Sequence, residues 1–334
     1  METENKKIDF LAIGDTVTDA FIRLEDAEVH CKVDNTACEL CVRFGDKVPY
    51  KEVTIVPAVG NAANAAVSAA RLGLRTALVT NLGKDREGEE CMENFKKENI
   101  STDFVKMHDG IKTNYHYVLL YEVDRTILIK HEKYPYTLPD IGEPEWIYFS
   151  SVGAHAYPFH NTVVEYLEKH PNIKLAFQPG KNEIKLGVEK MAGLYRNATI
   201  FFCNVEEAQV ILNNQSRDLL ELSKGIMALG PKLVAISDGP NGAYFYDGTN
   251  LYSIPLYPDT GPAIDRTGAG DAFASTFTAA LALGQDPTDA FAWGPINSMS
   301  VVQQIGAQKG LLSREKLEQL LKNAPEHYKV TKIN

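Results

Sequence analysis

The segment 265–273 combines glycines and a carboxylate at the expected start of a helix. It reads Asp-Arg-Thr-Gly-Ala-Gly-Asp-Ala-Phe, and the small apolar residues of 274–283 predict the helix that follows. Gly268 and Gly270 let backbone N–H groups converge, and the first turn of a helix has unpaired donors and partial positive charge. We therefore expect an anion, most obviously a phosphate, to bind beside Asp271. A carboxylate in a first turn can also simply complement the helix dipole.

A second group of polar residues follows the short apolar run 8–13. Gly14 ends this run, and Asp15 and Asp19 come shortly after it. The pattern is typical of a buried strand that ends at a site. A pair of carboxylates is therefore expected at a strand end.

The elements that position these residues alternate between strands and helices. Apolar runs predict strands at 8–13, 76–80, 146–150, 174–178, 200–203 and 233–237. Helical patterns lie between them at 61–72, 87–98, 162–170, 187–192, 206–212 and 219–229. This succession predicts a mostly parallel sheet covered by helices on both faces. The residues 243–246 and 250–254 resemble a hairpin near the edge of that sheet.

Residues 21–56 follow a different pattern, with brief alternating pieces separated by Gly45 and Pro49. Half-exposed strands are expected there, and further strands at 113–120 and 126–130. We expect one large α/β domain with a small β insertion.

Composition excludes several classes of protein. The 334 residues are 44% hydrophobic and 23% charged, as in an ordinary globular protein. The net charge of −10 argues against a nucleic-acid partner or an anionic membrane surface. The stretches without charge carry Pro, Gly, Asn or Gln and predict no membrane span, and the charged residues 1–9 do not resemble a secretory signal. A cytoplasmic enzyme or binding protein fits these observations.

The chain has five cysteines, an odd number, and it is long enough to be stable without disulfide cross-links. We therefore expect reduced thiols and no disulfides. Cys31, Cys38 and Cys41 have the spacing Cys-x6-Cys-x2-Cys, with His30 beside the first. Metal binding is one interpretation, but a clear second pair is missing. Packed thiols, or thiols at a contact between two copies, are the alternative.

Segment 265–273 resembles the second signature of the ribokinase-like (PfkB) sugar and nucleoside kinases, Asp-Thr-x-Gly-Ala-Gly-Asp-x-Phe, with Arg266 where threonine is commonest. Further matches occur in the family's order and cover nearly the whole chain. Residues 14–19 match the strand-end acceptor motif, residues 60–64 match the first signature, and residues 83–88 match the Gly-x-Asp-x-x-Gly turn. Residues 204–207 match the Asn-x-x-Glu motif, residues 237–242 match the nucleotide-contact turn, and residues 306–307 match the late Gly-Ala pair. Val59 takes the place of the usual first glycine of the first signature.

The resemblance implies one ribokinase-like domain over 1–334, a three-layer α/β/α sandwich with a small β-sheet lid. The expected lid is formed by about 20–56 and 111–134, and the α/β core by 1–19, 57–110 and 135–334. The implied reaction transfers the γ-phosphoryl group of ATP to a hydroxyl of a sugar. Asp271 would be the general base, while the N–H groups of Gly268, Ala269 and Gly270 hold the developing charge.

Several residues are expected to bind the acceptor. An ionised carboxylate accepts hydrogen bonds from vicinal hydroxyls, and the family resemblance favours Asp19, with Asp15 as the competitor or a turn acid. Asn64 would offer a donor and an acceptor to the same hydroxyls. The remaining residues that we assign to the acceptor site are Gly60, Asn61 and the lid aromatic Tyr117.

The nucleotide side is expected to include Asn204 and Glu207, which match the motif associated with Mg²⁺ and phosphate. Glu207 would act on Mg²⁺ through water, although the pair could instead form a capping box. Asp265 resembles part of the family's monovalent-cation loop, which suggests activation by K⁺, although Arg266 could pair with it. The other residues assigned to the nucleotide are Ser237, Gly239, Gly242, Thr267 and Asn297.

Two other functions stay open at this point. A nucleoside kinase on the same fold is the first, and it predicts lid aromatics such as Tyr115 or Tyr117 facing the acceptor cavity. A non-catalytic nucleotide-binding protein is the second. An uncovered edge of the lid sheet would favour a homodimer.

Overall fold

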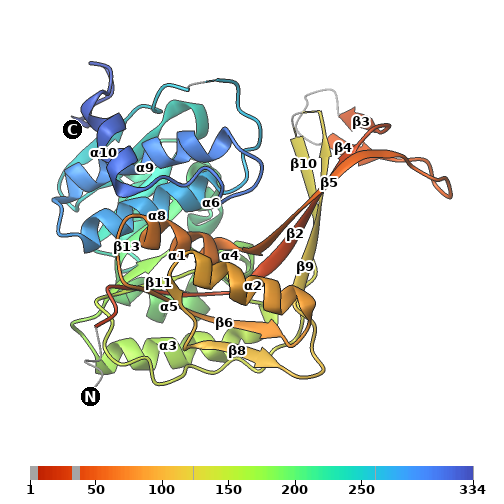
Figure 1. The fold of residues 1–334 in the computed structure, drawn as a ribbon. Helices are drawn as coiled ribbons and strands as arrows, with labels where there is room; N and C mark the ends of the chain where they lie inside the picture. The colour runs from red at the N-terminus through yellow and green to blue at the C-terminus, as the bar shows by residue number, and fades with distance from the viewer. Residues whose placement is uncertain (1–6, 32–37, 123, 260, 334) are drawn as a thin grey trace.

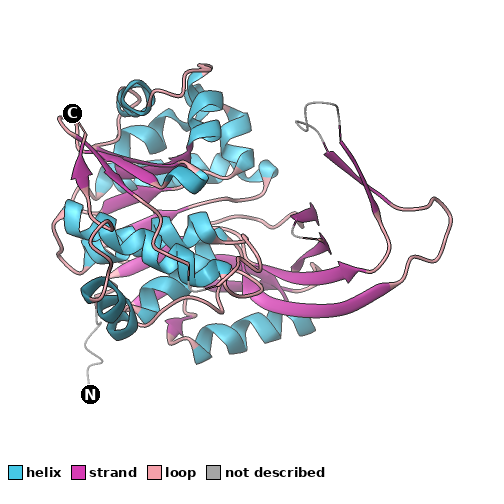
Figure 2. Ribbon diagram, turned by 90° about the horizontal axis from the view of Figure 1, so that it is seen from above, coloured by secondary structure: helices cyan, strands magenta, loops and turns pink. Residues whose placement is uncertain are grey.

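The computed structural model describes residues 7–31, 38–122, 124–259 and 261–333. Among these residues, the largest sheet has 11 strands, and helices cover both of its faces (Figures 1 and 2). A smaller four-stranded sheet projects from one side of this body (Figure 1). The chain therefore has the predicted three-layer α/β/α sandwich with a separate small sheet.

The centre of the main sheet is parallel. Its strands are, in spatial order, β14 (Leu233–Ser237), β13 (Ala198–Asn204), β12 (Lys174–Phe177), β11 (Trp146–Phe149), β1 (Phe10–Ile13) and β6 (Thr76–Gly83). Phe10 and Ala12 of β1 pack into one helical layer, and Leu11 and Ile13 pack into the other. Because both faces are covered, the central strands read as continuous apolar runs.

Short strands complete the two edges of this sheet. β7 (Ile100–Ser101) and β8 (Val105–His108) pair with β6. At the other edge β15 (Ala243–Tyr246), β16 (Leu251–Ile254) and β17 (Thr331–Lys332) are antiparallel. The hairpin predicted at 243–254 is confirmed at this edge.

The two helical layers follow the two hydrophobic clusters of the core. One layer holds α1 (Asn61–Arg71), α2 (Arg86–Lys97), α8 (Ala269–Ala282), α9 (Pro287–Val302) and α10 (Arg314–Lys322). The other holds α3 (Tyr157–Lys169), α4 (Lys181–Leu186), α5 (Val188–Asn197), α6 (Val205–Leu212) and α7 (Leu219–Met227). Within the part of the chain that the structure describes, none of these helices combines the length and apolar character that a membrane crossing requires.

The small sheet is built from two separate stretches of the chain. Its strands are, in spatial order, β10 (Asp124–Leu128), β9 (Asn114–Tyr121), β2 (Val17–Leu24) and β5 (Tyr50–Val59). Phe21 and Val118 are buried on the face that looks toward the body of the molecule, next to Ile305. Between β2 and β5 the chain forms a hairpin of β3 (Glu28–Cys31) and β4 (Cys38–Cys41), which extends away from the body (Figure 2).

Asp85 joins the small sheet to the main body. Its carboxylate accepts hydrogen bonds from Gly88 N at 2.9 Å, at the start of α2, and from Thr113 N at 2.8 Å and Thr113 Oγ1 at 2.6 Å, just before β9. Burial opposes ionisation of Asp85, but these hydrogen bonds outweigh it and lower the pKa. One carboxylate thus caps a helix and fixes the base of the small sheet.

The expectation of no disulfides is wrong, because Cys31 and Cys38 form one. They are directly opposite each other in the β3–β4 pair, with 4.0 Å between their Cα atoms, so the hairpin brings their sulfur atoms together. The number of cysteines gives no information on such a cross-strand pairing. Cys41, Cys91 and Cys203 are free thiols.

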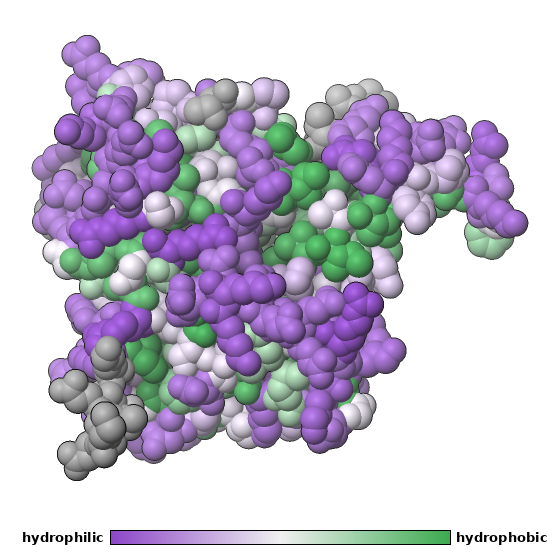
Figure 3. All heavy atoms as spheres, viewed as in Figure 1, coloured by the Kyte–Doolittle hydropathy of each residue, from purple (hydrophilic) through white to green (hydrophobic). Residues whose placement is uncertain are grey.

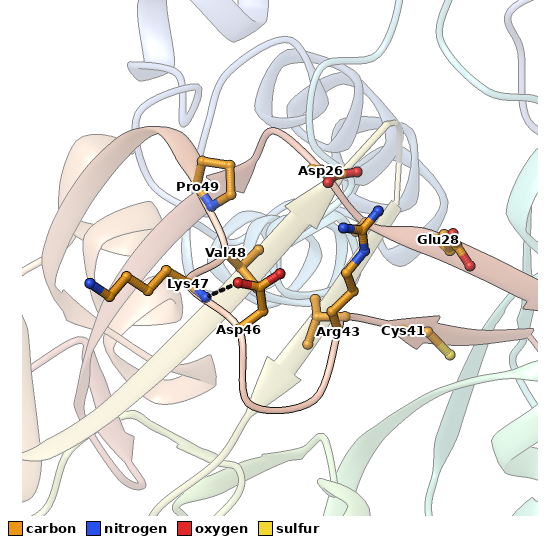
Figure 4. A pocket seen from close by; sticks show the side chains of 10 residues that line it. Asp26, Glu28, Cys41, Arg43, Asp46, Lys47, Val48 and Pro49 are labelled. Atoms are coloured by element: carbon orange, nitrogen blue, oxygen red, sulfur yellow. Dashed lines mark hydrogen bonds between the residues drawn. The ribbon is translucent and has the colours of Figure 1, made fainter.

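The metal interpretation of these cysteines also loses support. Two of the three thiols are consumed by the disulfide, and the described residues contain no cluster of His, Cys, Asp or Glu that could hold a metal ion. A cavity of about 260 Å³ lies beside Cys41. Figure 4 shows the side chains that line it, among them the polar Asp26, Arg43 and Asp46.

Candidate active site

A cavity of about 220 Å³ lies between the small sheet and the carboxyl edge of the main sheet. It brings together seven of the residues predicted from the sequence, namely Asp15, Asp19, Gly60, Asn61, Asn64, Thr267 and Asp271. Ile127 and Ile129 line it from β10 and the residues after it, and His116 from β9. Residues as far apart in the sequence as Asp15 and Ala307 therefore share one cavity.

Asp271 stands in the first turn of α8, where three side-chain amides surround its carboxylate. Asn61 Nδ2 donates to Oδ1 at 2.9 Å, Gln178 Nε2 donates to Oδ1 at 3.2 Å, and Asn64 Nδ2 donates to Oδ2 at 2.9 Å. Loss of hydration raises the pKa of Asp271, and the three hydrogen bonds partly oppose that rise. The arrangement suits a carboxylate that takes up a proton above the usual aspartate range.

The start of α8 is shaped by its glycines. Gly268 has φ +81°, and a Cβ added there would lie 2.3 Å from the Cβ of Ala307. A Cβ on Gly270 would meet nothing within 4 Å. The N–H of Ala269 donates to the Arg266 carbonyl over 3.5 Å, which is a weak bond that a bound anion could replace. Gly268 is thus required by the backbone, whereas Gly270 leaves open space beside the helix terminus.

The two carboxylates after β1 differ in how they are bonded. Asp15 accepts from the Tyr136 hydroxyl at 2.6 Å and lies 3.0 Å from His131 Nδ1, so both of its oxygens are engaged. Asp19 Oδ1 is buried without a hydrogen-bond partner among the described residues, 3.5 Å from His116 Nδ1. His116 Nε2 is likewise buried and unpartnered in the described structure. The unpaired atoms lie on two residues of the cavity wall.

The register of the small sheet explains which side chains reach this cavity. Asp19 on β2 pairs with His116 on β9, so both side chains project from the same face. Tyr117 is the next residue and projects to the other face, where it packs against Tyr115 with 5.2 Å between ring centroids. Tyr117 does not contribute to the described lining of the Asp271 cavity, and its predicted contact with the acceptor is not supported.

Asn204 and Glu207 form the capping box at the start of α6. Glu207 N donates to Asn204 Oδ1 at 2.7 Å, and Asn204 N donates to Glu207 Oε2 at 2.9 Å. Burial raises the pKa of Glu207, and the negative charge of Asp271 adds to the rise, so the two carboxylates interact electrostatically. Asn204 pairs with Ser237 on β14, and Gly239 and Gly242 flank the turn that follows. These residues form a strip at the carboxyl edge of the sheet that leads away from Asp271.

Two other predicted residues are bonded inside the protein. Asn297 is completely buried: its Nδ2 donates to Thr276 Oγ1 at 2.8 Å, and its Oδ1 accepts from Leu312 N at 2.9 Å. It packs between helices with both polar groups of its amide bonded inside the protein, which does not support a contact with the nucleotide. Asp265 accepts from Thr267 N at 2.9 Å and from Gly306 N at 3.0 Å, and no ion pair with Arg266 is found among the described side chains.

Several residues of the site have no motif that would reveal them. Gln178 follows β12, and His116 and His131 belong to the small sheet and the segment after it. Their only signal in the sequence is that Gln178 ends a predicted strand, at the edge where the other strands also end. The histidines depend on the pairing of β2 with β9, which a local pattern does not give.

Comparisons with known proteins identify the family and the fold. The family model "pfkB family carbohydrate kinase" matches residues 31–314. Ribokinase from Bacillus subtilis is 27% identical over 305 residues, which cover 87% of this chain and 98% of that protein. Nucleoside kinase from Methanothermobacter thermautotrophicus is 24% identical over 276 residues, covering 75% and 80% respectively. The structure of Arabidopsis thaliana ribokinase complexed with ribose and ATP covers 95% of this chain and 99% of that chain, with 19% identity and a TM-score of 0.78. The chain belongs to the pfkB family of carbohydrate kinases.

Proposed function

We propose that this kinase transfers the γ-phosphoryl group of ATP to a hydroxyl group of a sugar, with Asp271 as the general base. The observation that carries the proposal is that Asp271 and the unpartnered Oδ1 of Asp19 face one cavity. A carboxylate at a helix N-terminus and a second carboxylate with a free oxygen match the two needs of the reaction. One takes a proton, and the other holds the acceptor.

In this mechanism Asp19 and His116 bind hydroxyl groups of the sugar and place one further hydroxyl beside Asp271. Asp271 removes the proton from that hydroxyl, whose oxygen then forms a bond to the γ-phosphorus while the bond to the ADP oxygen breaks. The N–H groups at the start of α8 stabilise the negative charge on the transferred group. Ile127 and Ile129 cover the cavity and limit access of water to the phosphoryl group.

The nucleotide would extend from α8 along the strip formed by Asn204, Ser237 and the turn at Gly239 and Gly242. The space beside Gly270 is suited to a phosphate at the helix terminus. Glu207 would hold Mg²⁺ through water, which suits an ion that keeps much of its hydration shell. Bound Mg²⁺ would neutralise phosphate charge.

K⁺ activation is part of the proposal. Asp265 connects the backbone at Thr267 with the backbone at Gly306, the two segments that the family resemblance assigns to a monovalent-cation loop. A cation bound there would act on the start of α8 through this connection.

A sugar is favoured over a nucleoside as the acceptor. Both ribokinases and a nucleoside kinase are among the relatives, so the choice depends on the cavity. The described lining contains no Phe, Tyr or Trp on which a base could stack, because Tyr115 and Tyr117 lie on the other face of the small sheet. It also contains no Lys or Arg, but Asp15, Asp19 and Asp271. A neutral sugar without a phosphate group fits this charge.

We further propose a homodimer through the small sheet. Ile55, Tyr117 and Leu128 lie in one row across its outer face, and 54%, 48% and 51% of their surfaces are exposed. Figure 3 shows hydrophobic side chains gathered over this sheet. A second copy would cover them. We expect the reaction to take place in the cytoplasm, where ATP is available.

The test is a coupled assay of ADP release with pentoses, hexoses, their monophosphates and nucleosides, each with and without K⁺. ATP-dependent turnover is expected with a neutral sugar and not with sugar phosphates. Turnover with a nucleoside and with none of the sugars would show that the acceptor is a nucleoside. If no acceptor leads to ADP release while ATP still binds, a non-catalytic nucleotide-binding protein would be favoured.

A further inference from the structure

The carboxylate of Asp271 receives its three amide donors unequally. Within the described part of the chain, Oδ1 accepts from Asn61 and Gln178, whereas Oδ2 accepts from Asn64 alone. Each oxygen of an ionised carboxylate accepts about two hydrogen bonds. Oδ1 is therefore saturated, and Oδ2 retains one free position for an incoming hydroxyl.

Two of these amides also accept a hydrogen bond through their oxygen atoms, on the side away from Asp271. The Tyr148 hydroxyl donates to Gln178 Oε1, and Gln308 Nε2 donates to Asn64 Oδ1 at 3.0 Å and to the Ala58 carbonyl at 2.7 Å. An ionised carboxylate only accepts hydrogen bonds, so each amide must turn its nitrogen toward Asp271 and its oxygen away. The second donors satisfy those oxygens and fix the amides in this orientation.

We propose that Gln178 is a positioning residue for the base, that Tyr148 acts through Gln178, and that Oδ2 of Asp271 takes the proton from the acceptor. The inference rests on the proposed function of Asp271. Tyr148 is completely buried on β11, and burial raises the pKa of its hydroxyl well above the usual value, so it stays a donor at every working pH.

The predicted readout is the pH dependence of kcat/KM. Asp271 acts as a base only when ionised, so activity falls as the pH drops through its pKa, which burial raises above the usual aspartate value. A hydrogen bond to the ionised form of Asp271 opposes this rise. Removing such a hydrogen bond therefore moves the acid limb, the fall of kcat/KM at low pH, to higher pH. The other titratable groups that face Asp271 are Glu207 from α6, Tyr148 from β11, and Asp15, Asp19, His116 and His131 around the cavity.

The experiment compares wild type, Gln178→Met, Tyr148→Phe and the double variant between about pH 5 and pH 9, with thermal unfolding as a check of the fold. Gln178→Met is expected to move the acid limb up by about one pH unit, because a donor to a charged group is lost. Tyr148→Phe should shift it less in the same direction. In the Gln178→Met background Tyr148→Phe should have no further effect, since Tyr148 acts only through the amide. Tyr195→Phe removes another buried hydroxyl, from α5, and should shift nothing.

Three results would overturn the inference. In the first, folded Gln178→Met has the same acid limb of the kcat/KM profile as the wild type. In the second, Tyr148→Phe shifts the acid limb of Gln178→Met as much as it shifts that of the wild type. In the third, folded Gln178→Met has no turnover at any pH. In each of these cases wild-type turnover would leave the proposed function standing. A wild-type protein without turnover would instead contradict the proposed function.

Discussion

Asp15 and Asp19 are four positions apart, yet the structure gives them different surroundings. The oxygens of Asp15 are engaged by Tyr136 and His131, which belong to the segment that follows the small sheet. Asp19 keeps a buried oxygen without a hydrogen-bond partner among the described residues, 3.5 Å from His116 Nδ1. A buried oxygen without a hydrogen bond costs free energy unless a ligand satisfies it, so we expect Asp19, rather than Asp15, to accept a hydrogen bond from a hydroxyl of the acceptor.

Asp19→Asn is therefore expected to raise the KM for the acceptor about 10- to 100-fold, the loss typical of a hydrogen bond to a charged group. Asp15→Asn is the matched control. It should lower the free energy of unfolding by about 1 to 3 kcal/mol, because a bonded carboxylate is replaced inside the fold. Steady-state kinetics and urea unfolding measure the two effects. If Asp15→Asn raises KM and Asp19→Asn does not, the assignment of the two carboxylates is reversed.

At the scale of elements, the start of α8 depends on two glycines for different reasons. Gly268 adopts a left-handed conformation and lies against Ala307, whereas Gly270 has open space where a side chain would be. The first glycine serves the fold and the second serves access to the helix terminus.

Gly268→Ala should lower the free energy of unfolding by about 1 to 3 kcal/mol through backbone strain and the contact with Ala307. Gly270→Ala should leave the stability unchanged or slightly raised, since alanine favours a helix, while its methyl group weakens ATP binding. Chemical unfolding and a nucleotide titration separate the two outcomes. Undiminished ATP affinity in Gly270→Ala would show that no phosphate approaches this turn.

Elements with a strong local pattern could be predicted from the sequence. The central strands are buried on both faces and read as apolar runs, and the glycine-rich motif marked the start of α8. α9 was not predicted, because it contains Gly294 and Pro295, which normally interrupt a helix. A Cβ on Gly294 would lie 2.5 Å from the Phe273 ring, so tertiary packing against α8 requires this glycine.

Within the candidate site, too, residues in local motifs differ from residues that are placed by strand pairing. Asp271 and Asn64 stand in local motifs and could be predicted from the sequence. Gln178 and His116 reach the cavity only because the topology places β12 and β9 beside the correct strands. The Cys31–Cys38 disulfide also depends on a strand register that the count of cysteines does not contain.

At the scale of the whole molecule, the small sheet has one face on the cavity and one face toward solvent. Asp19 and His116 project inward, while Ile55, Tyr117 and Leu128 project outward. Because side chains alternate along each strand, a second copy that covered the outer face would stiffen the same strands that carry Asp19 and His116 on the inner face.

The wild-type protein is therefore expected to have about twice the chain mass of 37.0 kDa in light scattering. Ile55→Glu places a charge on the outer face and should yield a monomer. Val210→Glu is the matched control, because Val210 is 65% exposed on α6, a helix that packs against β13 and β14 of the main sheet. A wild-type monomer, or a dimer that Ile55→Glu leaves intact, would argue against an interface at this sheet.

We propose that Asp271 removes the proton from the acceptor during phosphoryl transfer from ATP. This role is tested most directly by the ADP release of Asp271→Asn with the best acceptor, measured beside the nucleotide affinity of the same variant. We predict that kcat falls by about 10² to 10⁴ while ATP binding is nearly unchanged. Near wild-type turnover by Asp271→Asn would show that Asp271 is not the general base.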